Sequence, residues 1–254
     1  MTIHDDAQQE LATLFPDATT SLAETDPEFW AYHADFALGE VLAESALSRA
    51  DRLTYQLAAT IAVGAHAPFR SLLRAALEHG VTPVQVKEVA YQAVAYVGVA
   101  RVVDFIAITN EVLTERGVAL PLPGQSTTTP ADRMDLGIAV QRQIVGTETV
   151  DAMYDDAPAD ALRFQRFLSA NCFGDHYTRT GFDLQHRELI TFALLVALGG
   201  ADTQVKGHVA ANRNVGTTRA QLLDVLTVLL PLVGYPRTLN GLAQVNAAAP
   251  AGDD

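Results

Sequence analysis

A repeated segment constrains the fold of this chain more than any other feature of its sequence. The stretch from Arg187 to Gly216 has a weaker copy from Asp51 to Gly80, and the two closing glycines set the offset between the copies. Further residues match at the same offset: Leu53 with Leu189, Gly64 with Gly200, Thr82 with Thr218, Gly98 with Gly234, and Arg101 with Arg237. An internal duplication of this kind predicts two structural repeats.

The spacing of apolar residues predicts helices along nearly the whole chain. Of the 254 residues, 49% are apolar but only 7% are aromatic, which suits closely packed helices. We expect Pro68 at the first position of its helix. The expected helices cover residues 27–48, 52–63, 68–80, 82–97, 100–116, 218–231 and 236–248, with two more in 132–171, broken near Gly146 and Pro158. Strand patterns are nearly absent, so the expected fold class is all-α, with two tandem helical repeats related by pseudo-twofold symmetry.

Matched helix starts support the duplication. Thr82 is followed three residues later by Gln85, and Thr218 is followed in the same way by Gln221. This spacing is that of a capping box, in which the threonine and glutamine side chains bind the first free backbone N–H groups of a helix. We therefore expect a helix to begin at the same point of each repeat.

A segment rich in proline separates the two copies. Residues 118–131 contain three prolines and a run of serine and threonine, which is typical of a loop. We expect a first repeat with its helical lead-in at residues 1–120, a linker at 121–131, and a second repeat at 132–254. The second repeat is the expected active copy.

Net charge and the absence of long apolar stretches argue against several classes of partner and location. The formal net charge is −13, so we expect neither nucleic acid nor an anionic membrane as a partner. The amino end is acidic and polar rather than a signal peptide, and no apolar stretch is long enough to span a bilayer, so the expected location is cytoplasmic. An anionic small-molecule substrate would need a local arginine or lysine.

Glu188 and His208 are the leading candidates for chemistry. Glu188 lies at the start of an otherwise apolar helix, and His208 lies on the next helix. In the first copy Arg52 and Leu72 occupy these positions, so the His208 position points inward and its imidazole needs a partner. We expect Glu188 to be that partner, in poorly solvated surroundings where the pair can transfer a proton. The alternatives are a carboxylate that stabilises a helix N-terminus and a purely structural histidine.

A polar segment, residues 171–181, precedes the second repeat. It carries Asp175, His176, Tyr177 and Arg179, a set that suits a connection binding a substrate carboxylate. The alternative is an ordinary loop, because Gly-Asp and Thr-Gly are typical turn dipeptides.

The remaining polar candidates have weaker support. Cys172 is the single cysteine, which excludes an internal disulfide, and we expect a small buried apolar side chain rather than a nucleophile. Asn214 is a candidate polar contact. Arg101 and Arg237 recur in both copies, which favours a structural task for them.

Residues 187–246 resemble the carboxymuconolactone decarboxylase family, which also holds the AhpD-like alkylhydroperoxidases, and residues 52–105 resemble it more loosely. The resemblance implies an all-helical fold and a ring-shaped assembly, here a homotrimer equivalent to six single repeats. The peroxidase branch of the family carries a Cys-x-x-Cys motif ending four residues before the family histidine. With His208 as that histidine, Ala201 and Gln204 stand at the two cysteine positions, so dithiol peroxidase chemistry is not expected.

The decarboxylase branch implies an enzyme that needs no cofactor and no metal. Loss of CO2 from γ-carboxymuconolactone places electrons on the lactone oxygen, after which a proton must reach carbon. The resemblance assigns carboxylate binding to Arg179 or Arg187, and oxyanion stabilisation to His176 or Tyr177. His208, paired with Glu188, is the expected general acid, with Asp175 and Asn214 as further substrate contacts.

Other interpretations remain open from the sequence. The same scaffold could act as an isomerase or cyclase on another biosynthetic intermediate, or could reduce peroxide through Cys172 alone. It could also be a non-catalytic ring that binds a ligand, or could hold a metal ion at Glu188, His208 and His176.

Overall fold

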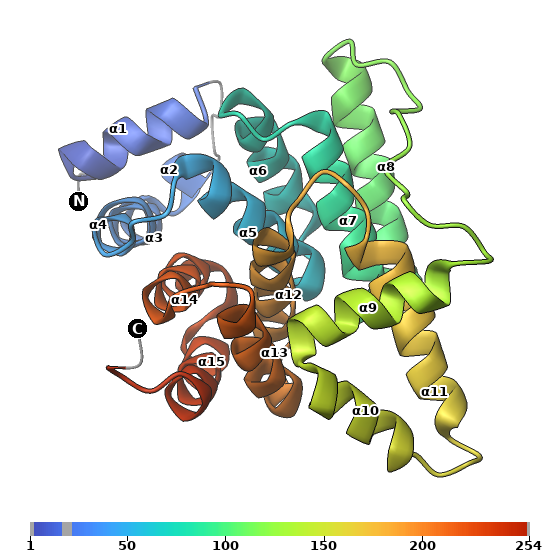
Figure 1. Cartoon of the computed structure of the whole chain (residues 1–254). Helices are drawn as coiled ribbons and strands as arrows, with labels where there is room; N and C mark the ends of the chain where they lie inside the picture. The colour runs from blue at the N-terminus through green and yellow to red at the C-terminus, as the bar shows by residue number, and fades with distance from the viewer. Residues whose placement is uncertain (1–2, 17–21, 253–254) are drawn as a thin grey trace.

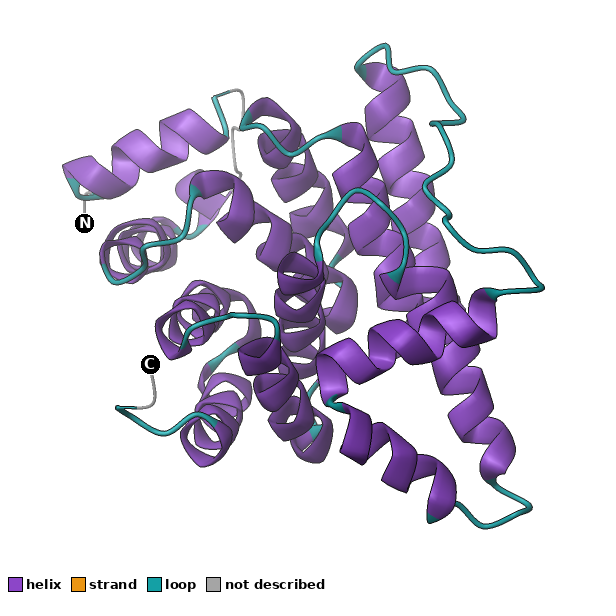
Figure 2. Cartoon of the chain, in the orientation of Figure 1, coloured by secondary structure: helices purple, strands orange, loops and turns teal. Residues whose placement is uncertain are grey.

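The computed structural model describes residues 3–16 and 22–252, and within these ranges all regular secondary structure is helical (Figure 2). The first part of the chain forms α1 (Asp5–Leu14), α2 (Leu22–Thr25), α3 (Pro27–Ala34), the π-helix η1 (Asp35–Glu40), α4 (Val41–Ala43), α5 (Arg49–Val63), α6 (His66–Glu78), α7 (Pro83–Val97) and α8 (Val99–Glu115). The second part forms α9 (Arg133–Val145), α10 (Thr147–Asp155), α11 (Leu162–Phe167), the π-helix η2 (Leu168–Tyr177), α12 (Leu184–Leu198), α13 (Asp202–Asn214), α14 (Arg219–Val233) and α15 (Tyr235–Ala248). In the described part of the chain, no helix is both long and apolar enough to cross a membrane.

The duplication predicted from the sequence is visible in the helix boundaries. Helices α6 and α13 begin and end at positions related by the offset between Gly80 and Gly216, and so do α7 and α14. The π-helices η1 and η2 also overlap at this offset, so the repeat extends into the lead-in. The all-α fold with two helical repeats is therefore confirmed.

Both predicted capping boxes are present. Thr82 Oγ1 accepts a hydrogen bond from Gln85 N at 3.2 Å, and Gln85 Oε1 accepts one from Thr82 N at 2.9 Å. Thr218 and Gln221 form the same pair of bonds at 3.1 and 2.9 Å. These caps fix where α7 and α14 begin, because they satisfy N–H groups that have no partner within the helix.

The two repeats share one apolar core. Helices α5 and α12 pack against each other at the centre of the molecule (Figure 1), and most of the buried apolar side chains of both repeats form one cluster. A smaller cluster, which includes Tyr177, lies between α9, η2 and α13. Every residue of α12 from 187 to 197 is buried. Burial of each large apolar side chain contributes about 1.5–3 kcal/mol, so α12 is held firmly in place together with the polar residues that it carries.

Several predicted helix boundaries are wrong. The helix expected over residues 27–48 ends at Ala43, and the helix expected from residue 52 begins at Arg49. Helix α6 begins at His66, so Pro68 is its third residue rather than its first, a position whose N–H would lack a helical partner in any case. Helix α14 continues past Pro231 to Val233. Pro231 has no N–H to donate to the carbonyl of Thr227, yet the helix continues for two more residues, and Gly234 N still donates to Leu230 O at 2.9 Å.

The expectation that residues 171–181 form a connecting loop is also wrong for most of the segment. The π-helix η2 continues to Tyr177, and the chain leaves the helix only at Thr178. Gly174 is a packing residue rather than a turn residue, since a Cβ atom there would lie 2.1 Å from Arg133 O. A Cβ atom at Gly137 would likewise lie 2.0 Å from Ser169 O. The two glycines let α9 and η2 pack backbone against backbone, a contact that the local sequence does not reveal.

Candidate active site

The expected contact between Glu188 and His208 is present. Glu188 lies on α12, where burial of the surrounding apolar residues leaves its side chain fully inaccessible, and its Oε2 lies 2.8 Å from His208 Nδ1 on α13. The His208 side chain is 18% exposed. Its Nε2 forms no hydrogen bond with any residue that the structure describes. The arrangement fixes the imidazole through one nitrogen and leaves the other free to meet a ligand.

Tyr177 completes the surroundings of the Glu188 carboxylate. Its hydroxyl, at the end of η2, donates to Glu188 Oε1 at 2.6 Å and lies 2.8 Å from Thr191 Oγ1. Because Tyr177 donates its single proton to Glu188, it accepts from its other hydroxyl neighbours. Burial, followed by the nearby charge of Glu188, holds the pKa of Tyr177 well above its usual value. Tyr177 therefore remains a hydrogen-bond donor at neutral pH.

The first repeat also contributes to this site, through Tyr96 of α7. The Tyr96 hydroxyl lies 2.9 Å from that of Tyr177, and its ring meets the His208 ring edge to face at 5.8 Å between centroids. Tyr96 was not predicted from the sequence, because it belongs to the first repeat, which lacks the glutamate and the histidine. The residue at the matching position of the second repeat is Leu232, so the difference between the copies was a usable signal.

Cys172 of η2 lies beside Tyr96 but is not disposed to react. Its Sγ lies 3.7 Å from the Tyr96 hydroxyl and the residue is 8% exposed. Burial raises the pKa of the Cys172 thiol to about 12. A thiol is nucleophilic only as the thiolate, which is scarce at neutral pH under these conditions.

Arg187 lies inside the protein, bound to other protein groups. Its side chain is fully buried, Nη2 donates to Glu88 Oε2 at 3.1 Å, and Nη1 donates to Gln92 Oε1 at 2.9 Å. Nη2 also donates to the backbone oxygens of Arg179 and Thr180, at 2.8 and 3.0 Å. These contacts give Arg187 a positioning task between the repeats, because α7 supplies both side-chain partners. Its Nε has no hydrogen-bond partner among the described residues, but it is buried, so direct contact with a substrate carboxylate, expected from the sequence, would require the substrate to enter the interior.

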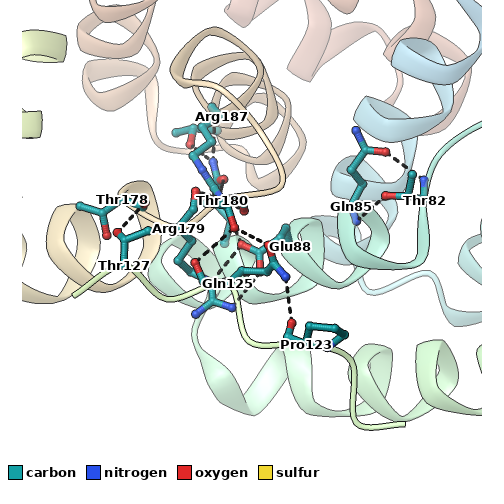
Figure 3. A network of polar contacts seen from close by, with 12 residues as sticks. Thr82, Gln85, Glu88, Pro123, Gln125, Thr127, Thr178, Arg179, Thr180 and Arg187 are labelled. Atoms are coloured by element: carbon teal, nitrogen blue, oxygen red, sulfur yellow. Dashed lines mark hydrogen bonds and ion pairs between the residues drawn. The ribbon is translucent and has the colours of Figure 1, made fainter. Parts of the chain in front are cut away.

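Arg179 binds the same carboxylate from the outer side (Figure 3). Its Nε lies 3.0 and 2.9 Å from the two oxygens of Glu88, and its Nη2 lies 2.8 Å from Oε1. Glu88 is 1% exposed, whereas the Arg179 side chain is 20% exposed and lines a cavity. Sequence reasoning missed Glu88, which neutralises part of the charge that was expected to bind substrate.

A chain of hydrogen bonds joins this arginine cluster to the Glu188–His208 pair. Gln92 Nε2 donates to Arg187 O at 2.7 Å and to Thr191 Oγ1 at 2.9 Å. Thr191 contacts Tyr177, which in turn contacts Glu188. Gln92 was not identified from the sequence, because nothing in the pattern of one helix shows which helix of the other repeat it will face.

The other predicted site residues lie apart from the pair or in different contacts. His176 Nδ1 is buried without a hydrogen-bond partner among the described residues, and burial lowers the pKa of this imidazole. Asp175 forms an ion pair with Arg133, and Asn214 donates to Ile144 O at 2.8 Å. Asp175 therefore joins η2 to the start of α9, and Asn214 joins α13 to the last turn of α9.

The histidine, cysteine and acidic side chains of the described residues do not gather in groups of three suited to a metal ion. Glu188, His208 and His176 thus do not form the metal site considered as an alternative. The chemistry available at the pair is proton transfer and hydrogen bonding.

Comparison with known proteins identifies the family. The model of the carboxymuconolactone decarboxylase family matches residues 27–111 and 163–247, two segments related by the same offset as the repeats. The 4-carboxymuconolactone decarboxylase of Acinetobacter baylyi is 28% identical over 104 residues, which are 41% of this chain and 77% of the relative. A crystal structure from Burkholderia xenovorans LB400, provisionally assigned as a gamma-carboxymuconolactone decarboxylase subunit, covers 97% of both chains. It has a TM-score of 0.57 and 20% identity, a likeness of fold alone. Because the family model matches two segments that together cover most of the chain, this chain belongs to the carboxymuconolactone decarboxylase family.

Proposed function

We propose that the protein is a cofactor-independent lyase that removes CO2 from a small anionic lactone or a related carbonyl acid. The observation that carries the proposal is the His208–Glu188 pair, with Nδ1 of the imidazole fixed by a buried carboxylate and Nε2 free. The name of the Acinetobacter baylyi relative makes 4-carboxymuconolactone the first substrate to test.

The reaction has three requirements. The bond between carbon and the carboxylate breaks, the electron pair moves onto the lactone oxygen, and a proton reaches carbon. We assign the proton transfer to His208 Nε2, since Glu188 stabilises the imidazolium that must form first. After transfer the neutral imidazole regains its proton from water, so the net change is loss of CO2 and gain of one proton by the substrate.

The hydroxyl groups of Tyr177 and Tyr96 suit stabilisation of the developing oxyanion. Such donors contribute most when they are fixed in advance in a site that excludes water. Tyr177 donates to the Glu188 carboxylate, whereas Tyr96 donates only to the neutral Tyr177 hydroxyl. Tyr96, whose ring also faces His208, therefore has the weaker acceptor to leave when it turns to a bound substrate. We propose that His176 stays neutral and lines the site, and that the positive charge of Arg179 attracts the substrate anion from a longer distance.

The test is release of CO2 from 4-carboxymuconolactone by the wild type, His208→Ala and Glu188→Gln. We expect kcat to fall at least about 100-fold in both variants, the usual contribution of a general acid. His66→Ala, which removes a half-exposed ring from α6, serves as a control that keeps its activity. If the wild type turns over no lactone acid and the variants assemble normally, the non-catalytic ligand-binding ring becomes the better interpretation.

A further inference from the structure

We propose that the cavity lined by Arg179 is a binding site for a small organic carboxylate, held by Lys87 and Arg179. The cavity lies between α7, α8 and the inter-repeat segment 118–131, and has a volume of about 440 Å³. Neither Glu188 nor His208 lines it. Arg179 also has a part in the lyase function proposed above, whereas Lys87 has none, so variants at Lys87 test this site separately from the lyase function.

Lys87 is the first observation behind the proposal. The chain has only two lysines, Lys87 and Lys206, and Lys87 is 7% exposed. Its Nζ donates to Asn110 Oδ1, a neutral acceptor, and no carboxylate of the described residues forms an ion pair with it. Burial lowers the pKa of this ammonium group, and no acidic side chain in the described ranges offsets the effect. Because a buried charge is costly without a counter-charge, the position is suited to an anion from outside.

The second observation is the excess of positive charge around the cavity. Of the described residues, Glu88 is the only carboxylate that lines it, and both Arg179 and Arg187 bind Glu88. Lys87 and Arg179 line the cavity with Glu88, whose charge is already paired with Arg179 and with the buried Arg187, in a chain whose formal net charge is −13. This local excess attracts an anion into the cavity against the field of the rest of the molecule.

The walls indicate what kind of anion fits. The Tyr91 ring lies in cation–π contact with both cations, 5.8 Å from Lys87 Nζ and 5.4 Å from Arg179 Cζ. Apolar side chains line much of the remainder: Val84, Ile106, Leu120, Leu122 and the prolines between and after the last two. A volume of this size is within the range of small-molecule sites. The combination favours a carboxylate attached to a flat apolar body over a bare inorganic ion.

The inter-repeat segment is fixed in place as one wall of the cavity (Figure 3). Thr180 N donates to Gln125 O at 3.1 Å, and Gln125 Nε2 donates to Pro123 O at 2.8 Å. Thr127 Oγ1 donates to Thr178 O at 2.8 Å. The wall is thus built before a ligand arrives, which lowers the ordering cost of binding.

The test is isothermal titration of the purified full chain with phthalate, which carries two carboxylates on one flat ring. We expect saturable binding with a Kd of about 1 mM or lower, and no binding of the uncharged dimethyl phthalate. Absence of phthalate binding, or equal binding of the diester, would overturn the proposal. Equal affinity for inorganic phosphate would overturn the assignment to an organic acid.

Variants at two positions locate the binding. Lys87→Met removes the charge and is expected to weaken phthalate binding at least tenfold, whereas the exposed Lys206→Met is expected to change it less than twofold. Asn110→Asp places a carboxylate against the Lys87 ammonium and is expected to abolish binding while the lysine remains. Circular dichroism melts establish that each variant is folded. Unchanged phthalate binding in folded Lys87→Met or Asn110→Asp protein would contradict the site.

Discussion

Tyr177 donates a 2.6 Å hydrogen bond to Glu188, and both groups are buried in the second repeat. The bond holds one carboxylate oxygen so that the other faces His208. Without it, the carboxylate would keep one buried acceptor unpaired, and the hydroxyls of Thr191 and Tyr96 would lose an acceptor. In the reaction that we propose, the task of Tyr177 is therefore to position Glu188.

Tyr177→Phe is expected to reduce both stability and turnover. An unpaired buried polar group costs about 1–3 kcal/mol, which urea unfolding will measure. We expect kcat to fall roughly tenfold, since a loosened carboxylate holds the imidazole less well. Tyr154→Phe is a matched control, because Tyr154 also forms hydroxyl contacts in partly buried surroundings, to Ser169 Oγ and to the backbone oxygen of Gln165. A loss of activity equal in both variants would show that only stability is affected.

Glu88→Gln is expected to be among the most destabilising single changes in the chain. The variant leaves Arg187, fully buried, without its counter-charge, and breaking a buried ion pair in this way costs about 3–5 kcal/mol. Glu111→Gln is the matched control, because its pair with Arg70 is largely exposed and worth about 1 kcal/mol or less. Chemical denaturation of both variants makes the comparison, and equal losses would contradict a structural role for the buried cluster.

Of the groups at the site, the sequence predicted Tyr177 from its polar segment, and Glu188 and His208 from the difference between the two copies. Arg52 and Leu72 at the matched positions marked those residues as special to the second repeat. Tyr96 also differs from its counterpart, Leu232, but that difference does not show where its side chain lies. Glu88, Gln92 and Tyr96 all lie on α7 of the first repeat and reach the site only through packing between repeats. The sequence of a helix shows which face is apolar, but not which helix will cover it.

Helix starts and ends were predicted best where one local interaction decides them. Thr82 and Thr218 cap their helices through side chains three residues away, so the sequence contains the whole interaction. Gly174 was misjudged for the opposite reason. Its role depends on Arg133, far earlier in the chain on α9, and a glycine in sequence looks the same whether it turns the chain or lets two helices meet.

His186 gives stability a defined dependence on pH. Its ring lies 2.8 Å from Asp183 and 3.4 Å from Asp51 of the first repeat, and hydrogen bonding to Asp51 raises the pKa of His186 to about 9. The folded-state pKa is above the unfolded value of about 6.5, so the stabilisation is complete below pH 6.5 and is lost as pH rises through about 9.

The corresponding variant is His186→Gln, compared with the wild type by thermal unfolding at several pH values. We expect it to be less stable by about 1 kcal/mol at pH 6, a modest figure because the ring is partly exposed and water screens the pairs. The difference should close above about pH 9. His66→Gln, which removes a more exposed ring, is the control. A difference that stays constant from pH 6 to pH 10 would contradict the assignment.

Exposed apolar side chains at matched positions favour the predicted trimer. Val99 and Val103 at the start of α8 are 62% and 53% exposed, and their counterparts Tyr235 and Leu239 on α15 are 60% and 55% exposed. Repetition of such a patch in both repeats suits a ring in which each repeat offers the same face. The double variant Val103→Glu with Leu239→Glu is expected to sediment as a monomer.

The control for assembly is Phe29→Glu, because this exposed aromatic has the polar Gln165 as its counterpart in the second repeat. We expect Phe29→Glu to sediment like the wild type. Sedimentation of the wild type as a monomer, or of the double variant as a trimer, would contradict the proposed face.

Imidazole rescue of His208→Ala tests the central claim most directly, with 4-carboxymuconolactone as substrate. The cavity left by the side chain opens beside the buried Glu188 carboxylate, which can bind a free imidazole as it binds the native ring. We predict that added imidazole restores part of the lost turnover in His208→Ala and none in Glu188→Gln. If His208→Ala keeps turnover within about threefold of the wild type, far from the loss of about 100-fold expected for a general acid, the proton-transfer assignment is contradicted.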